Sequence, residues 1–156
     1  MPRVPSFAKS DFFTRPLRAH ARRVLLAGIE DATTIKGAAG GVAAITLDAC
    51  GGAMNRPGPS ATAFIHRDAL FLAQYSTTWT SPGNRSDVLR QHSWLRAYYQ
   101  SLHPHASGQA YQNYVDPDLT DWSSAYYGAN YPWLTVVKAS FDPANVFQFP
   151  QSILPG

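Results

Sequence analysis

AYQNYVDPDL, residues 110–119, places two tyrosines, one asparagine and two aspartates within ten positions. The segment QAYQNYVD (109–116) alternates in polarity and is rich in aromatic residues, which predicts a β-strand. Because side chains two apart on a strand share a face, Gln112 and Tyr114 are expected to point the same way. The aspartates that follow are typical of turns and helix caps.

Further strands are predicted upstream of this segment, where short apolar runs are bounded by turn residues. They are FAKSDFF (7–13), VAAITLDA (42–49) as a central strand, ATAFIH (61–66) and ALFLAQYSTTW (69–79).

Helices are predicted between these strands and after them. Thr14 is a candidate N-cap with Pro16 in the first turn, and apolar residues then follow at helical spacing. A second helix is predicted to begin near Ser86. Two short helices are predicted within residues 116–143, the second entered through Asn130 and Pro132.

The order of these elements defines the expected fold class. Strand, helix, strand, strand, helix, strand predicts an α+β fold, with helices on one face of an antiparallel sheet. A length of 156 residues fits one domain, 1–156, with its own core.

The charge distribution argues against nucleic-acid binding. Residues 1–36 carry seven Lys or Arg against three acids, whereas no Lys or Arg occurs between Arg96 and Lys138. A nucleic-acid groove needs basic and aromatic residues side by side, and here they lie in different parts of the chain.

Composition also bears on location and metal binding. Cys50 is the only cysteine, and the sequence has neither an apolar leader nor the roughly 20 apolar residues of a membrane span. We therefore expect a cytoplasmic protein without membrane contact. His103-Pro104-His105 lacks the partners of a metal site, so no metal is expected.

The uncovered face of the predicted sheet is the candidate binding surface. If Thr46, Asp48, Gln74, Gln112 and Tyr114 all fall on it, they form a polar platform. Two alternatives stay open on the residues alone. Asp48 could cap the turn at the following glycines, and Tyr114 could be a sheet aromatic whose hydroxyl reaches water.

Several words of the sequence, taken in order, resemble one enzyme family. They are FAKSDFFTRPL, LDACGGAMNR, TAFIHRDALFLAQY and AYQNYVDPDLTDWSSAYYGANYPWLTVVKASFDPANVFQFPQSI. Together they resemble the C-terminal part of the berberine bridge enzyme-like FAD-linked oxidases, in the vanillyl-alcohol oxidase superfamily. The resemblance extends over nearly the whole chain and implies an antiparallel sheet whose open face covers the flavin and holds the substrate.

The resemblance also implies roles for individual residues. Tyr114 matches the catalytic base that deprotonates a substrate hydroxyl, and Gln74 matches a residue beside flavin and substrate. The implied substrate-binding residues are Thr46, Asp48, Gln112, Tyr111 and Asn113. The family's FAD-binding domain has no counterpart in this sequence, so FAD is expected only if a flavin domain is supplied in trans.

Three functions follow from these expectations. The chain could be the substrate-binding part of an FAD-linked oxidoreductase acting on a small molecule of natural-product type. It could instead be a free-standing, flavin-independent cyclase or isomerase, or a non-catalytic binding module. The expected partners are a small-molecule substrate and either a separate flavin domain or further copies of the chain.

Overall fold

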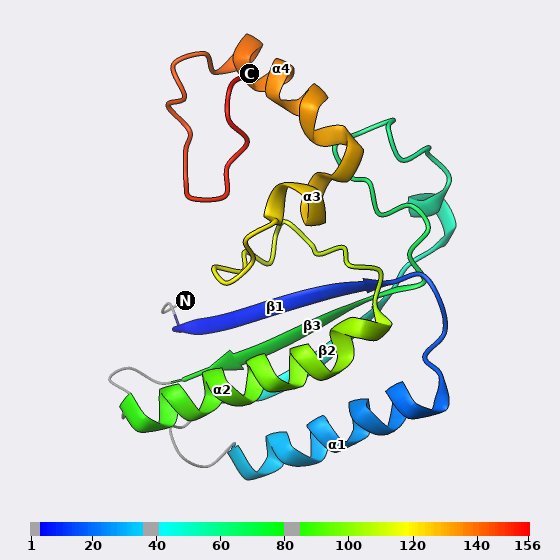
Figure 1. Ribbon diagram of the computed structural model, residues 1–156, viewed down its shortest axis with the longest axis vertical. Helices are drawn as coiled ribbons and strands as arrows, with labels where there is room; N and C mark the ends of the chain where they lie inside the picture. Colours follow the sequence, from blue (N-terminus) through cyan, green and yellow to red (C-terminus); the bar gives the residue numbers. More distant parts are fainter. Residues whose placement is uncertain (1–3, 36–40, 80–84) are drawn as a thin grey trace.

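The computed structural model describes residues 4–35, 41–79 and 85–156, and its core is a three-stranded antiparallel sheet with helices on one face (Figure 1). The strands are β1 (Ser6–Phe13), β2 (Ala43–Ala49) and β3 (Phe71–Thr78), in the order β1-β3-β2. The longer helices are α1 (Ala19–Ile35) and α2 (Arg85–Leu102), which lie together against the sheet. The expected α+β class is confirmed.

The C-terminal third adds two further helices, α3 (Trp122–Tyr127) and α4 (Tyr131–Phe141). Asn130 precedes α4 and Pro132 lies in its first turn, as the sequence predicted. Short 3₁₀ turns complete the described elements: η1 (Gly52–Asn55), η2 (His103–His105) and η3 (Gly128–Asn130). In Figure 1, α4 and the last residues project away from the sheet.

Strand alternation divides the sheet into two faces. Phe71, Ala73 and Tyr75 of β3 pack in one cluster with Leu95 and other residues of α2, so the odd-numbered positions face the helices. The even-numbered positions of all three strands therefore occupy the opposite, open face. The main core lies between sheet and helices.

The two long helices approach each other closely at Gly28. A Cβ atom at this position would lie 2.0 Å from the Tyr98 ring, whose hydroxyl donates a hydrogen bond to the Leu25 carbonyl at 2.7 Å. Gly28→Ala is therefore expected to lower the free energy of unfolding by up to about 2 kcal/mol. A clash costing about 1–3 kcal/mol outweighs the roughly 1 kcal/mol that alanine gains in helix propensity.

Urea unfolding measures this effect, with Ala27→Ser as the matched change on the exposed side of the same helix. The control should stay within about 0.5 kcal/mol of the wild-type protein. A Gly28→Ala protein as stable as wild type would show that Tyr98 can move aside.

Two predicted strands are wrong. Residues 61–66 form bends and irregular backbone, in which the Arg67 guanidinium donates hydrogen bonds to the Phe64 carbonyl and to Thr62 Oγ1, and the Phe64 N–H donates to the same Thr62 oxygen. Residues 109–116 also form no strand, because their backbone groups bond partly to side chains and partly within a turn. The Tyr111 N–H donates to Ser10 Oγ at 2.9 Å, and the Tyr114 N–H donates to the Tyr111 carbonyl at 2.9 Å.

Two smaller expectations are corrected as well. VAAITLDA forms β2, but β2 lies at an edge of the described sheet, and β3 is central. The first helix begins at Ala19 rather than after Thr14. Its first turn is closed by the Arg22 N–H, which donates a hydrogen bond to the Arg18 carbonyl at 3.0 Å. Within the described residues, no helix has the length and apolar character needed to cross a bilayer.

Candidate functional site

The open face of the sheet brings together three of the predicted polar residues. Thr46 and Ser10 are the register partners of Gln74 on its two sides, and Asp48 lies two residues beyond Thr46 on the same face. Thr46 and Asp48 are exposed, and Gln74 is half-buried. The predicted platform is therefore present at its strand positions.

Tyr114 lies beside Gln74 although it is not on a strand. Both residues line a cavity of about 280 Å³, together with Asn113 and residues at the start of β1. Tyr114 packs edge-to-face on Tyr111, with ring centroids 5.2 Å apart, and both rings rest on the cluster around Phe12 and Leu72. The open face is thus walled on one side by the tyrosine-rich segment.

The surroundings of Tyr114 disfavour its ionised form. Burial is the main cause that raises the pKa of the phenol, and the negative charge of Asp48 adds to it. In the described part of the chain, no Lys or Arg forms a hydrogen bond or ion pair with the hydroxyl. As this chain presents it, Tyr114 is a protonated phenol at neutral pH.

The other predicted residues of the segment have separate roles in the packing. Asn113 Nδ2 donates a hydrogen bond to the Tyr111 hydroxyl at 2.8 Å, which fixes these two side chains relative to each other. Gln112 is half-buried with its Oε1 unpartnered among the described residues, and it does not line the cavity of Gln74 and Tyr114. Gln112 therefore does not join the platform as the strand prediction required.

A buried ion pair anchors the tyrosine-rich segment to β1. Lys9 Nζ lies 2.8 Å from Asp116 and 3.1 Å from Asp118, and the Lys9 and Asp116 side chains are only 6% and 5% exposed. Arg96 binds Asp118 from outside at 2.7 Å. The guanidinium of Arg96 and the ammonium of Lys9 lower the pKa of Asp118 to about 2.

Gln151, near the C-terminus, also holds Asp116 in place through hydrogen bonds. Gln151 Nε2 donates to the Asp116 carbonyl at 2.7 Å, while Gln151 Oε1 accepts from the Tyr126 hydroxyl at 3.1 Å. The Asp116 N–H in turn donates to the Tyr126 oxygen at 3.1 Å. Sequence reasoning assigned the aspartates to turns and missed this network. The available signal was Lys9, a charged residue in the middle of an aromatic strand.

A second buried network lies on the helix-covered face. The Asp11 carboxylate is fully buried, accepts a hydrogen bond from the Tyr75 hydroxyl at 3.1 Å, and lies 2.7 Å from His103 Nδ1. Burial raises the pKa of Asp11, and the hydrogen bond to Asp11 raises the pKa of His103. Among the described residues, no three His, Cys, Asp or Glu side chains gather as metal ligands would.

This network predicts a pH-dependent stability. Because the pKa of His103 is higher in the folded than in the unfolded protein, its contribution is complete below about pH 6.5 and is lost as pH rises through the folded pKa. We expect the urea midpoint to fall between pH 6 and pH 9. His103→Asn should flatten this dependence, whereas His105→Asn, an exposed change in the same turn, should preserve it. An unchanged slope in His103→Asn would contradict the assignment.

Comparison with known proteins identifies the class to which this fold belongs. A family model described as berberine and berberine like matches residues 110–154. An uncharacterized FAD-linked oxidoreductase of Bacillus subtilis (strain 168), YgaK, is 41% identical over 113 residues, which cover 72% of this chain and 24% of that protein.

Solved structures share the fold over almost the whole chain. BBE-like 1 of Physcomitrella patens superposes with a TM-score of 0.81 and 33% identity, covering 98% of this chain and 31% of that one. The glycopeptide hexose oxidase DBV29, complexed with teicoplanin, gives 0.82 and 28% identity, covering 98% and 33%.

The α+β domain described here is thus of the kind found in FAD-linked oxidoreductases. The chain belongs to the berberine bridge enzyme-like family, as its sequence words indicated. It spans about a quarter of the length of the curated relatives it matches.

Proposed function

We propose that this chain is the substrate-facing part of an FAD-linked oxidoreductase that acts on a small organic molecule of natural-product type. The observation that carries the proposal is the shared cavity of Gln74 and Tyr114 on the open face of the sheet. An amide and a phenol that converge on one small cavity can orient a substrate hydroxyl and exchange a proton with it. Family membership supports the redox class.

The open face fits one wall of a flavin site. Thr46 and Gln74 are register partners and present a hydroxyl and an amide side by side on the open face, which suits contact with a polar ring. The adjoining cavity of about 280 Å³ falls at the lower limit of the roughly 300–1,000 Å³ typical of complete small-molecule sites. The remaining walls would then come from another domain. FAD, when bound against Thr46 and Gln74, would supply the acceptor for the hydride that leaves the substrate alcohol.

Within that arrangement we assign the proton step to Tyr114. Its phenolate oxygen would accept the hydroxyl proton of the substrate, and the amide of Gln74 would hold the substrate oxygen in place. Thr46, Asp48, Tyr111 and Asn113 would line the binding surface. Because the chain raises the pKa of Tyr114, a cation from the partner or the substrate has to lower it.

A separate flavin domain, or a second copy of this chain, is the proposed protein partner. The C-terminal segment leaves large apolar side chains in solvent: Trp133 is 61% exposed, Phe141 87% and Phe147 79%. Neighbouring Val136, Val146 and Phe149 are exposed as well. Large apolar side chains exposed in number along one segment suggest an interaction site.

The raised pKa of Tyr114 favours a second candidate. A phenol that stays protonated at neutral pH is a general acid, and a flavin-independent cyclase or isomerase needs such a donor. In this case the same cavity would bind its substrate without FAD.

Visible absorbance separates the two proposals. Purified protein is measured before and after addition of FAD, alone and together with the flavin domain of a relative. Retained flavin in either mixture is the result expected for the oxidoreductase. Protein that stays colourless in both would overturn it and favour the cofactor-free reaction.

Light scattering tests the partner proposal. We expect the isolated chain to self-associate, and Phe141→Ser/Phe147→Ser to shift it toward the monomer, because both side chains lie in solvent and are not needed for the core. Leu26→Ser, an exposed apolar residue on α1, is the matched control. A wild-type protein that is strictly monomeric and binds no flavin domain would contradict the proposal.

A further inference from the structure

A large polar cavity among the described residues lies away from the open face. It measures about 600 Å³ and sits where β1 runs into α1 and where α2 ends in η2. This volume accommodates a small molecule. The cavity shares no lining residue with the one formed by Gln74 and Tyr114.

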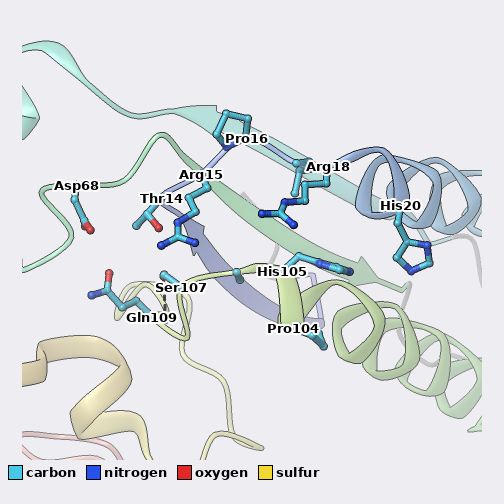
Figure 2. Close-up of a pocket in the computed structure, with 12 residues that line it drawn as sticks. Thr14, Arg15, Pro16, Arg18, His20, Asp68, Pro104, His105, Ser107 and Gln109 are labelled. Atoms are coloured by element: carbon cyan, nitrogen blue, oxygen red, sulfur yellow. Dashed lines mark hydrogen bonds between the residues drawn. The ribbon is translucent and has the colours of Figure 1, made fainter.

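The lining of this cavity is cationic. Figure 2 shows the guanidinium groups of Arg15 and Arg18 directed into it, with His105 beneath Arg18. Neither arginine has an ion pair or side-chain hydrogen bond within residues 4–35, 41–79 and 85–156. Asp68 is the single acid that lines the cavity, and it forms no ion pair in the same residues. The two arginines therefore outnumber the one acid, and the lining carries a net positive charge.

The histidines add to this polarity from two walls. His20 from α1 and His105 from η2 meet edge to face, with ring centroids 5.7 Å apart. Each imidazole ring carries at least one N–H group, which can donate a hydrogen bond to an anion.

Uncharged donors also face the cavity. The Gln109 Oε1 lies 3.0 Å from His66 Nδ1, which leaves the Gln109 amide nitrogen without a partner among the described residues. The start of α1 contributes backbone N–H groups, because its helical hydrogen bonds begin only with Arg22 donating to Arg18. The positive end of the helix macrodipole points the same way.

We propose that this cavity binds a multivalent oxyanion, a small molecule that carries phosphoryl or several carboxyl groups. Two arginine forks match the oxygens of such groups, and the histidines, the free amide and the helix start complete a donor-rich lining. The site is independent of the proposed oxidoreductase chemistry, since it lies at the other cavity.

Titration of inorganic pyrophosphate by calorimetry, in about 50 mM NaCl so that screening is limited, tests this site. Saturable binding is expected for the wild-type protein. Each of Arg15→Gln and Arg18→Gln should weaken it roughly tenfold, and the double variant about a hundredfold, because each removes a charge-assisted hydrogen-bond donor.

The control is Arg23→Gln, which removes the same charge from an exposed position of α1 outside the cavity. It should change the affinity less than twofold. Citrate titrated in parallel identifies the ligand class: tighter pyrophosphate assigns phosphoryl, and tighter citrate assigns carboxylate. The ring signals of His20 and His105 should shift with either ligand.

Three results would overturn the proposal. The first is the absence of saturable binding up to about 10 mM of either anion. The second is a double variant that binds as tightly as the wild-type protein. The third is an Arg23→Gln protein that loses as much affinity as the cavity variants, which would indicate a general effect of charge. Since both cavity arginines are exposed and without partners among the described residues, the variants should melt like the wild-type protein.

Discussion

Lys9→Met is expected to lower the free energy of unfolding by about 3–5 kcal/mol, the largest loss that we expect from a single substitution in this chain. The methionine keeps the length of the side chain but leaves the buried Asp116 without its cation. A buried carboxylate that loses its partner keeps its desolvation cost and gains nothing in return. With typical stabilities of about 5–15 kcal/mol, the loss would consume a large part of the total.

Arg96→Gln is the matched control, because Arg96 and Lys9 bind the same Asp118 from two sides. The outer pair is 44% and 34% exposed, so its removal should cost less than about 1 kcal/mol. Urea unfolding of the two variants compares them directly. Equal losses would show that burial of the Lys9 pair has no energetic consequence.

The double variant Lys9→Met/Asp116→Leu provides a second measurement should Lys9→Met fail to fold. Replacing both partners by apolar groups removes the unpaired charge, so stability should recover toward that of the wild-type protein. Hydrogen exchange adds a local readout: the amide of Tyr111, bonded to Ser10, should exchange faster in Lys9→Met because the segment is no longer anchored. An unchanged exchange rate of the Tyr111 amide would show that Lys9 contributes to global stability but does not hold the segment that carries Tyr114.

Most helices and strands of this fold could be predicted from local sequence, whereas the strand order and the long-range contacts could not. Strands β1 and β3 and helices α2 and α4 show their own periodicity of apolar residues, so their sequences suffice. The edge position of β2 depends on strand order, which its apolar composition does not reveal. Residues 109–116 alternate like a strand, yet they run beside the sheet and are held by Ser10, Tyr126 and Gln151.

The same distinction between local pattern and tertiary packing applies to the residues of the candidate site. Thr46, Asp48 and Gln74 were predictable as neighbours because they lie on regular strands with a period of two. Tyr114 reaches the same face through a turn, and Lys9 and Asp116 are 107 positions apart. Such contacts are set by tertiary packing, which local pattern does not encode.

Tyr114→Phe is expected to reduce turnover by about 10²–10⁴-fold, the range that a positioned acid or base contributes. The assay uses the reconstituted protein with whichever substrate the wild-type protein converts. Stability should change little, because the Tyr114 hydroxyl makes no hydrogen bond to the described residues and the ring that packs on Tyr111 is kept. Ligand affinity should likewise stay within a few-fold. Tyr111→Phe is the matched control: it removes a phenol from the same wall at a position assigned to binding. Equal activity in Tyr114→Phe and the wild-type protein would remove Tyr114 from the chemistry.

The pH dependence of turnover then distinguishes the two roles of the phenol. If Tyr114 acts as base, only the phenolate is active, so the rate should rise with pH toward its raised pKa. If it acts as acid, the protonated form is active, and the rate should be flat through neutral pH and fall above that pKa. A base whose pKa has been lowered by a cation from the flavin-domain partner would move the rising limb to lower pH only when that domain is present. The position of this limb, with and without the partner, therefore tests whether the missing cation is supplied in trans, and its disappearance in Tyr114→Phe assigns it to this residue.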